Sequence, residues 1–173
     1  MRRILLSLAG VALLALLAAA LADAGKARPG FLVVRKAQGD GGLYGPPVVT
    51  VVVQGFALGR ASQEARVDIY HLPSAKGGGV PHAVGADVSS RVVHWRRFTG
   101  TQYSGSGFRF SAIGGAYRVV IRGSGVYLFA GGHGTVKLHG SSVYRAGDGA
   151  YSVDGRAFRS LPGAPLELPI GNG

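Results

Sequence analysis

The sequence predicts an all-β protein, a single antiparallel β-sandwich or barrel-like domain that follows an N-terminal signal-peptide helix. Two observations support the fold class. After residue 22, short runs of β-branched and aromatic residues alternate with polar ones, at the period of a half-buried strand, and many of the 30 glycines divide these runs. No segment there shows the i, i+3, i+4, i+7 apolar spacing of an amphipathic helix.

The chain begins with the features of a secretory signal. Arg2 and Arg3 precede an uncharged apolar run at residues 4–22, which ends in a small-x-small triplet of the kind that signal peptidases cleave. We therefore predict that residues 1–22 are a signal peptide cleaved after Ala22, and that the protein is secreted or held in the cell envelope. The alternative is an uncleaved membrane anchor, because a run of this length can just span a bilayer.

Length and composition predict one domain without disulfides. Removal of residues 1–22 leaves about 150 residues, enough for one sizeable core. The chain has no cysteine, so an exported product must be held together by that core. We place a linker at residues 23–30, the all-β domain at 31–160, and an irregular tail rich in proline and glycine at 161–173.

The first half of the domain contains predicted strands separated by loops rich in glycine and proline. The β-branched run at residues 48–61 is long, and Gly55 within it predicts a bulge or bend, so the run is one bent strand or two. In residues 65–72, Val67 and Ile69 alternate with polar residues, as in a half-buried strand. The other predicted strands are residues 31–35, 89–100 and 107–112, and the predicted loops are residues 36–47 and 73–87.

The second half contains four units in which alternating apolar residues lie between two glycines. Because successive side chains of a strand point to opposite faces, one alternate set in each unit should form a core layer. Glycines between units, at residues 123–125 and 131–134, predict hairpin turns, and the uneven spacing of the units favours an antiparallel meander over a β-solenoid. The units are residues 115–123, 125–131, 134–140 and 149–155, and the predicted core layer is Tyr117, Val119, Ile121, Tyr127, Phe129, Val136, Leu138, Tyr151 and Val153.

The motifs of several enzyme classes are missing from the sequence. It contains neither of the glycine-rich phosphate-binding motifs, and no serine has the G-x-S-x-G context of a hydrolase elbow. The five histidines stand singly, so no metal site and no cofactor is predicted. A hydrolase site assembled from dispersed residues, around Asp68, His71 and the loop 73–87, stays open because triad members meet in space and not in sequence.

Cationic and aromatic residues form the candidate binding surface. The chain has 19 Lys and Arg against 8 acidic residues, scattered without long runs, which predicts attraction to anionic surfaces rather than a basic tail. If the first and third glycine-framed units lie near each other in one sheet, four cationic side chains share a face. That face is either a binding patch for anions or an ordinary solvated strand face. The only tryptophan is a stacking platform or a core anchor. The candidate binding residues are Arg118, Arg122, Lys137 and His139 on the strands, and Trp95, Arg96 and Arg97 around the tryptophan.

Together these features predict an exported small β-domain that acts as a non-enzymatic binding or structural module of the bacterial envelope or extracellular space. Its expected partner is an anionic envelope polymer, a glycan or a membrane surface. The alanine-rich signal and the abundance of glycine, valine and arginine resemble the composition of small secreted proteins from bacteria with GC-rich genomes. The alternatives are a secreted hydrolase with a dispersed site and a membrane-tethered protein with an uncleaved N-terminal helix.

Overall fold

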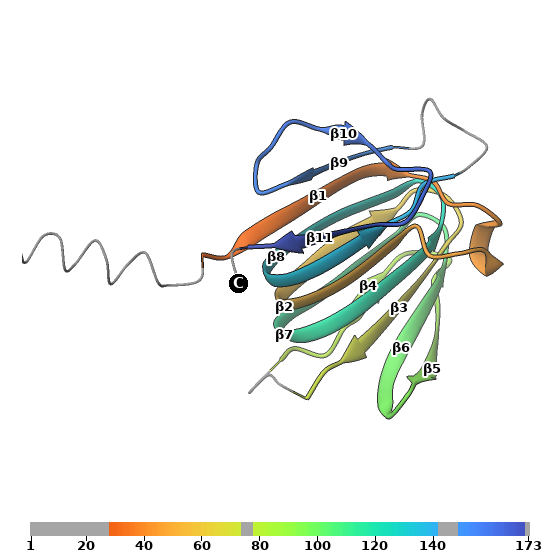
Figure 1. Cartoon of the computed structure of the whole chain (residues 1–173). Coiled ribbons are helices and arrows are strands. Elements are labelled where there is room, and N and C mark those ends of the chain that lie inside the picture. Colours follow the sequence, from red (N-terminus) through yellow and green to blue (C-terminus); the bar gives the residue numbers. More distant parts are fainter. Residues whose placement is uncertain (1–27, 74–77, 142–148, 172–173) are drawn as a thin grey trace, which may run out of the picture.

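The computed structural model describes residues 28–73, 78–141 and 149–171, which form one antiparallel β-sheet and a short 3-10 helix (Figure 1). The all-β prediction is confirmed for these residues. The predicted signal peptide lies outside them, and within them no helix is long and apolar enough to cross a membrane. The elements are β1 (Gly30–Ala37), η1 (Gly42–Tyr44), β2 (Val49–Ala61), β3 (Ala65–His71), β4 (His82–Val84), β5 (Ser89–Trp95), β6 (Phe98–Gly105), β7 (Phe108–Gly123), β8 (Val126–Leu138), β9 (Ala150–Val153), β10 (Arg159–Ser160) and β11 (Leu166–Ile170).

Three long strands, β2, β7 and β8, lie side by side in the middle of the sheet, with β2 between the other two. β2 pairs with both of the others along its whole length, whereas the two ends of β7 and of β8 have different outer neighbours, which divides the sheet into two half-sheets. The first part of β8 pairs with β1 and its last part with β11, whereas the first part of β7 pairs with β4 and its last part with β3. Half-sheet one therefore adds β11, β3, β6 and β5 to the long strands, and half-sheet two adds β1, β9, β10 and β4.

Glycines in the middle of the long strands allow the sheet to fold over on itself. Gly55 has a φ of +151° and Gly132 a φ of +133°, values that residues with a Cβ rarely adopt. The two backbones also come close together, since a Cβ on Gly132 would lie 2.0 Å from the carbonyl oxygen of Gln54. In β7 the extra residue Gly114, with a φ of +74°, forms a bulge next to this bend. The bend predicted at Gly55 is confirmed, and β2 is one bent strand.

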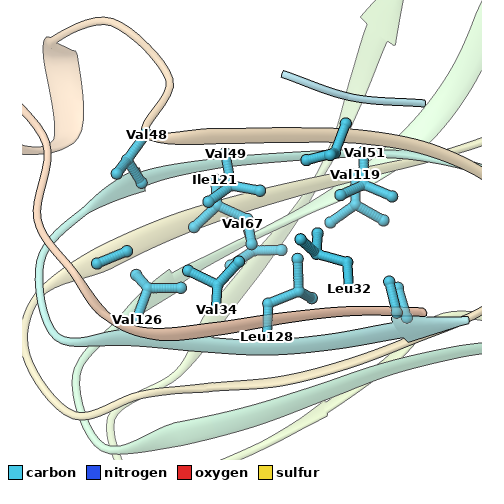
Figure 2. Close-up of a cluster of buried hydrophobic side chains, with 14 of the residues drawn as sticks. Leu32, Val34, Val48, Val49, Val51, Val67, Val119, Ile121, Val126 and Leu128 are labelled. Atoms are coloured by element: carbon cyan, nitrogen blue, oxygen red, sulfur yellow. The ribbon is translucent and has the colours of Figure 1, made fainter. Parts of the chain in front are cut away.

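The two half-sheets face each other across one hydrophobic core (Figure 2). Val51 and Ile121 of half-sheet one point toward Leu32 and Leu128 of half-sheet two, and each of these side chains is at most 2 % exposed. Burial of a side chain of this size stabilises the folded state by about 1.5–3 kcal/mol relative to leaving it in water. Since the chain has no cysteine, no disulfide joins the two half-sheets, and this apolar contact stabilises them face to face.

Two glycine segments that predicted chain breaks lie inside long strands. Residues 131–134, predicted as a hairpin turn, are part of β8 and stay in register with β2, so the second and third glycine-framed units are one strand. Residues 107–112 and the first unit likewise merge into β7, because the extra glycine is absorbed as a bulge rather than a turn. A glycine that lets the backbone bend or approach another strand looks the same in the sequence as one that turns the chain.

The continuity of β8 changes which of its side chains are core. The alternation of the strand runs on unbroken, so Leu128 points inward and Tyr127 and Phe129, predicted as core, point outward. Phe129 is 43 % exposed and forms edge contacts with Phe31 and Phe56 on the outer surface. Among the other predicted core residues, Tyr117, Val119, Ile121, Val136, Leu138 and Tyr151 are buried, and Val153 packs against the core while partly exposed.

The hairpin predicted at residues 123–125 is also wrong, because β2 lies between β7 and β8. The segment instead crosses from the end of β7 in half-sheet one to the start of β8 in half-sheet two. The connection between β2 and β3 crosses beside it: the N–H of Ser62 donates to the carbonyl oxygen of Gly125 at 3.0 Å, and the N–H of Ser124 donates to that of Glu64 at 3.2 Å. These two crossings are hydrogen-bonded to each other at one end of the fold.

Two short edge strands occupy segments that the sequence predicted as irregular. β4 lies within the predicted loop 73–87 and pairs with β7, and β11 lies within the predicted tail 161–173 and pairs with β8. Pro169 of β11 stands opposite Thr135, which an edge strand tolerates because one side of it has no ladder to complete. A segment rich in proline and glycine can therefore still form an edge strand, because an edge strand needs hydrogen bonds along one side only.

We predict that Gly132→Ala destabilises the protein by roughly 3 kcal/mol, because alanine meets both the positive φ and the nearby carbonyl oxygen. The free energy of unfolding in urea measures this effect. Gly163→Ala is the matched control, since a Cβ at Gly163 meets nothing within 4 Å, and it should change stability by less than about 0.5 kcal/mol. Equal effects of the two substitutions would contradict the role of the bend.

Candidate functional site

Half-sheet one carries a row of arginines on its outer surface, away from the core. The register between β3 and β7 puts Arg66 beside Arg122 and Tyr70 beside Arg118, all on alternate positions that point outward while Val67 and Ile69 point inward. We name this surface the arginine face. It consists of Arg66, Asp68, Tyr70, Arg91, Gln102, Arg118 and Arg122, with Trp95, Arg96, Arg97 and Phe98 of the β5–β6 hairpin at one end.

At the hairpin end of the arginine face, Arg118 lies against two aromatic rings. Its guanidinium carbon is 4.2 Å from the centroid of Trp95 and 5.8 Å from that of Tyr70. Trp95 also stacks on Phe98, with ring centroids 5.5 Å apart and planes at 28°. Burial lowers the pKa of Arg118, because it disfavours the charged guanidinium, and raises the pKa of Tyr70, because it disfavours the phenolate. The arginine stays protonated at neutral pH, and contact with the rings offsets part of its desolvation.

Arg118 keeps hydrogen-bond donors for a ligand. Among the described residues, no carboxylate lies within ion-pair distance of its guanidinium. Its two aromatic contacts are with ring faces, and its guanidinium N–H groups donate no hydrogen bond to another described residue. An anion that reaches the guanidinium of Arg118 would therefore meet several N–H donors, which share one positive charge.

Two further cations occupy the turn of the β5–β6 hairpin. The guanidinium carbon of Arg96 is 5.0 Å from the Trp95 ring centroid, and that of Arg97 is 5.5 Å from the Phe98 ring centroid. Arg96 has a φ of +54°, a left-handed conformation that costs a non-glycine residue about 1–2 kcal/mol. The turn thus holds an arginine at a position where glycine would be the less strained residue.

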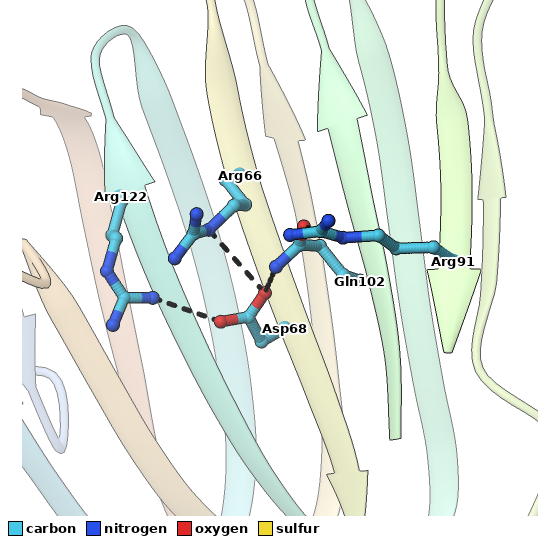
Figure 3. Close-up of polar contacts among 5 residues, drawn as sticks. All are labelled: Arg66, Asp68, Arg91, Gln102 and Arg122. Atoms are coloured by element: carbon cyan, nitrogen blue, oxygen red, sulfur yellow. Dashed lines mark hydrogen bonds and ion pairs between the residues drawn. The ribbon is translucent and has the colours of Figure 1, made fainter. Parts of the chain in front are cut away.

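Asp68 is the only acidic residue of the arginine face, and both of its oxygens are engaged (Figure 3). Its Oδ2 accepts a hydrogen bond from Nη1 of Arg122 at 3.0 Å, and its Oδ1 accepts one from Nε2 of Gln102 at 2.5 Å. Nε of Arg66 is 3.8 Å from Oδ1, at ion-pair distance. The sequence predicted a half-buried strand with a polar outer side, but Asp68 is only 5 % exposed because these longer side chains cover it.

Asp68 and His71, which the sequence left open as parts of a dispersed hydrolase site, do not meet, and residues 74–77 of the loop predicted beside them lie outside the described residues. Asp68 faces outward into the arginine face, whereas the ring of His71 contacts the ring of Tyr117, with centroids 5.0 Å apart. The two side chains lie at positions of opposite parity in β3 and so point to opposite sides. Across the described ranges, no three His, Cys, Asp or Glu side chains come together where they could hold a metal ion.

The structure divides the predicted binding residues into two groups. Trp95, Arg96, Arg97 and Arg118 come together, and Arg122 lies further along the same face in contact with Asp68. Lys137 points to the same side of half-sheet one, but β2 separates β8 from β7 by two strand spacings, about 10 Å. It stands opposite Glu167 of β11, and His139 follows the end of β8.

Sequence reasoning missed the residues that complete the face, namely Tyr70, Phe98, Arg66, Arg91 and Gln102. One signal was present, because the outward positions of β3 read Arg-x-Asp-x-Tyr, which is an unusual run of interacting groups for a solvated strand. The partners of these groups come from strands β5, β6 and β7, and only the register between strands brings them together.

Comparison of the chain with known protein families, with curated proteins and with solved structures finds no match. The chemistry of the site is therefore argued from its own residues. Guanidinium groups bind carboxylate, sulfate and phosphate oxygens through charge-assisted hydrogen bonds, and aromatic planes stack on sugar rings and bases. The arginine face offers both kinds of group side by side, since Arg118 lies against Trp95.

We predict that Asp68→Asn destabilises the protein by about 3 kcal/mol, because it leaves Arg122 and Arg66 partly buried without a counter-charge. Urea unfolding measures the change. Asp87→Asn, at an exposed loop position, is the matched control and should leave the free energy of unfolding within about 0.5 kcal/mol of the unsubstituted protein. If Asp68→Asn were as stable as this control, the ion pair would not organise the face.

Proposed function

We propose that the protein is a non-enzymatic binding module that holds an anionic polymer on its arginine face. The observation that carries this proposal is the imbalance of charge: six arginines lie on or at the end of the face, against one acidic residue whose two oxygens are already bonded. Such a surface attracts anions over distances of several ångströms and focuses them on the strands between the two groups of arginines.

The length of the face fits a polymer better than a single small anion. Along β3, Arg66 and Tyr70 are four residues apart, which corresponds to about 13 Å of extended strand. Arginines therefore stand at both ends of a strip, with rings of Trp95 and Phe98 at one end. A chain with repeating charges could contact both ends at once, which raises its affinity above that of its isolated units.

The setting that we propose for this activity is the bacterial envelope or the extracellular space. The supporting evidence is in the sequence, where a positively charged start and an apolar run precede a cleavage-type triplet before residue 23. A β-sandwich made by folding one sheet, without disulfides, is our interpretation of the finer architecture. Envelope and extracellular polymers commonly carry carboxylate, sulfate or phosphate groups, to which guanidinium groups bind well.

A binding role accounts for the site better than the hydrolase alternative. A general acid or base needs a carboxylate or imidazole that can reach a substrate. Asp68 is buried under Arg122 and Gln102, and its two oxygens accept hydrogen bonds from them. Its carboxylate organises neighbouring donors and offers no open oxygen to a substrate.

We expect the protein to bind dextran sulfate and not neutral dextran, with an affinity that falls as salt rises because bound counterions are released. Arg118→Gln should weaken dextran sulfate binding about tenfold, since it removes a charge-assisted contact. Titration calorimetry at two or more salt concentrations measures both effects.

Arg109→Gln is the matched control for this substitution, because Arg109 lies on the same strand, β7, but in half-sheet two and exposed there. It should leave the affinity nearly unchanged. Binding that does not depend on salt, or an equal loss of affinity in both variants, would show that the arginine face is not the binding surface.

A further inference from the structure

We propose that a cavity at the far end of the arginine face binds a tetrahedral oxyanion ester, the phosphate or sulfate group of the ligand. This inference deepens the proposed function and rests on it for the larger ligand, because it names the charged group that the polymer carries. The cavity has a volume of about 370 Å³, within the range of small-molecule sites. Its polar lining consists of Arg66, Ser89, Ser90, Arg91, Gln102 and Ser104.

The cavity lies where three strands meet the short helix η1. Arg66 comes from β3, Arg91 from β5 and Gln102 from β6, and Leu43 and Tyr44 of η1 complete the lining. Tyr44 is 91 % exposed, so its ring borders the opening rather than filling it. A charged group could enter here while the rest of the ligand extends along the arginine face toward Trp95.

The charges around the cavity are not balanced within the protein. Arg66 and Arg122 lie at ion-pair distance from Asp68, and Arg91 contacts Gln102 beside it, so this group holds three positive charges and one negative charge. Two unit charges are therefore uncompensated near the cavity. This excess suits a group that carries up to two negative charges, as a phosphate monoester does at neutral pH.

Arg66 has a buried donor without an acceptor. Its Nε is shielded from solvent and makes no hydrogen bond, because the nearest oxygen of Asp68, at 3.8 Å, is too far for one. A buried donor left unpaired costs about 1–3 kcal/mol. Because a solvent-shielded Nε is closed to a ligand as well, the donors that Arg66 offers to an anion in the cavity are its terminal nitrogens.

Arg91 is held in place by a chain of hydrogen bonds that begins at Asp68 (Figure 3). The carboxylate of Asp68 can only accept, so the amide of Gln102 must turn its Nε2 toward it and its Oε1 away. That Oε1 then accepts from Nε of Arg91 at 2.7 Å. Because only Nε is used, both terminal nitrogens of Arg91 remain as a pair of donors for two oxygens of one ligand.

The hydrogen-bond donors of the cavity come from different strands, and this arrangement favours tetrahedral over planar oxyanions. A planar carboxylate is satisfied by one guanidinium fork, whereas a tetrahedral group presents three oxygens in different directions. Arg66 and Arg91 stand on strands separated by β6, and Ser89 and Ser104, which pair with each other across β5 and β6 on the same side of the sheet, line the same cavity. Phosphate and sulfate therefore match this arrangement better than acetate does.

The test is a titration of the full chain with inorganic phosphate, inorganic sulfate and acetate at constant ionic strength. Binding is followed by calorimetry and by the NMR signals of the Gln102 side-chain amide. We expect phosphate or sulfate to bind at least tenfold more tightly than acetate and to shift those signals. Arg91→Gln should weaken phosphate binding at least tenfold, and Arg109→Gln should leave it unchanged because Arg109 lies in half-sheet two and does not line the cavity.

The outcomes separate this inference from the proposed function. If phosphate and sulfate leave the Gln102 signals unmoved while dextran sulfate still binds through Arg118, the cavity proposal is wrong and the proposed function stands. If Arg91→Gln binds phosphate as well as the unsubstituted protein does, the cavity proposal is also wrong. If phosphate binds in the cavity but dextran sulfate does not bind, the cavity proposal stands and the polymer-binding function fails. The Gln102 signals are read in the unsubstituted protein, so this part of the test does not depend on the folding of any variant.

Discussion

The close approach of backbone at the glycine bends is the constraint on which the rest of this structure depends. At Gly55 and Gly132, the strands β2 and β8 bend without breaking, at a separation that leaves no space for a Cβ. β2 and β8 keep their alternation from one half-sheet to the other, and in β7 the bulge at Gly114 shifts the inward set by one residue, so apolar side chains face inward in both half-sheets. The fold thereby has one core and two outer surfaces, and the polar surface of half-sheet one is free to carry a binding site.

A single buried carboxylate organises that surface. Asp68 is bonded on one side to Arg122 and on the other to Gln102, which in turn positions Arg91. Removal of a charge from water is costly, and the cost is met here by close, directional partners. The result is a strip in which arginines are held in fixed orientations rather than left to sample solvent. Preorganised donors lose less conformational entropy when they bind, which favours recognition of an anion.

The sequence predicted strands well and their connections poorly. Alternation identified β1, β2, β3 and the inner residues of β7, because side-chain period two is a local property. The glycines at 131–134 predicted a turn that does not exist, since glycine permits both a turn and a close approach of two strands. Continuing the period through them would have placed Leu128 inside and Phe129 outside, as the structure has them.

In the site, Trp95 and its two neighbouring arginines could be recognised from the sequence, because they are adjacent in the chain. The contact of Trp95 with Arg118 and Tyr70 could not, because it depends on the register between strands that are distant in the sequence.

The most direct measurement of the central claim, that the arginine face holds an anionic polymer, uses the fluorescence of Trp95. It is the only tryptophan of the chain and lies against Arg118, so its emission reports on this face alone. We expect dextran sulfate to change the intensity or wavelength of the emission in a saturable way that salt reverses, and neutral dextran to leave it unchanged. Emission that stays constant while sedimentation shows dextran sulfate bound to the protein would place the polymer elsewhere and contradict the account.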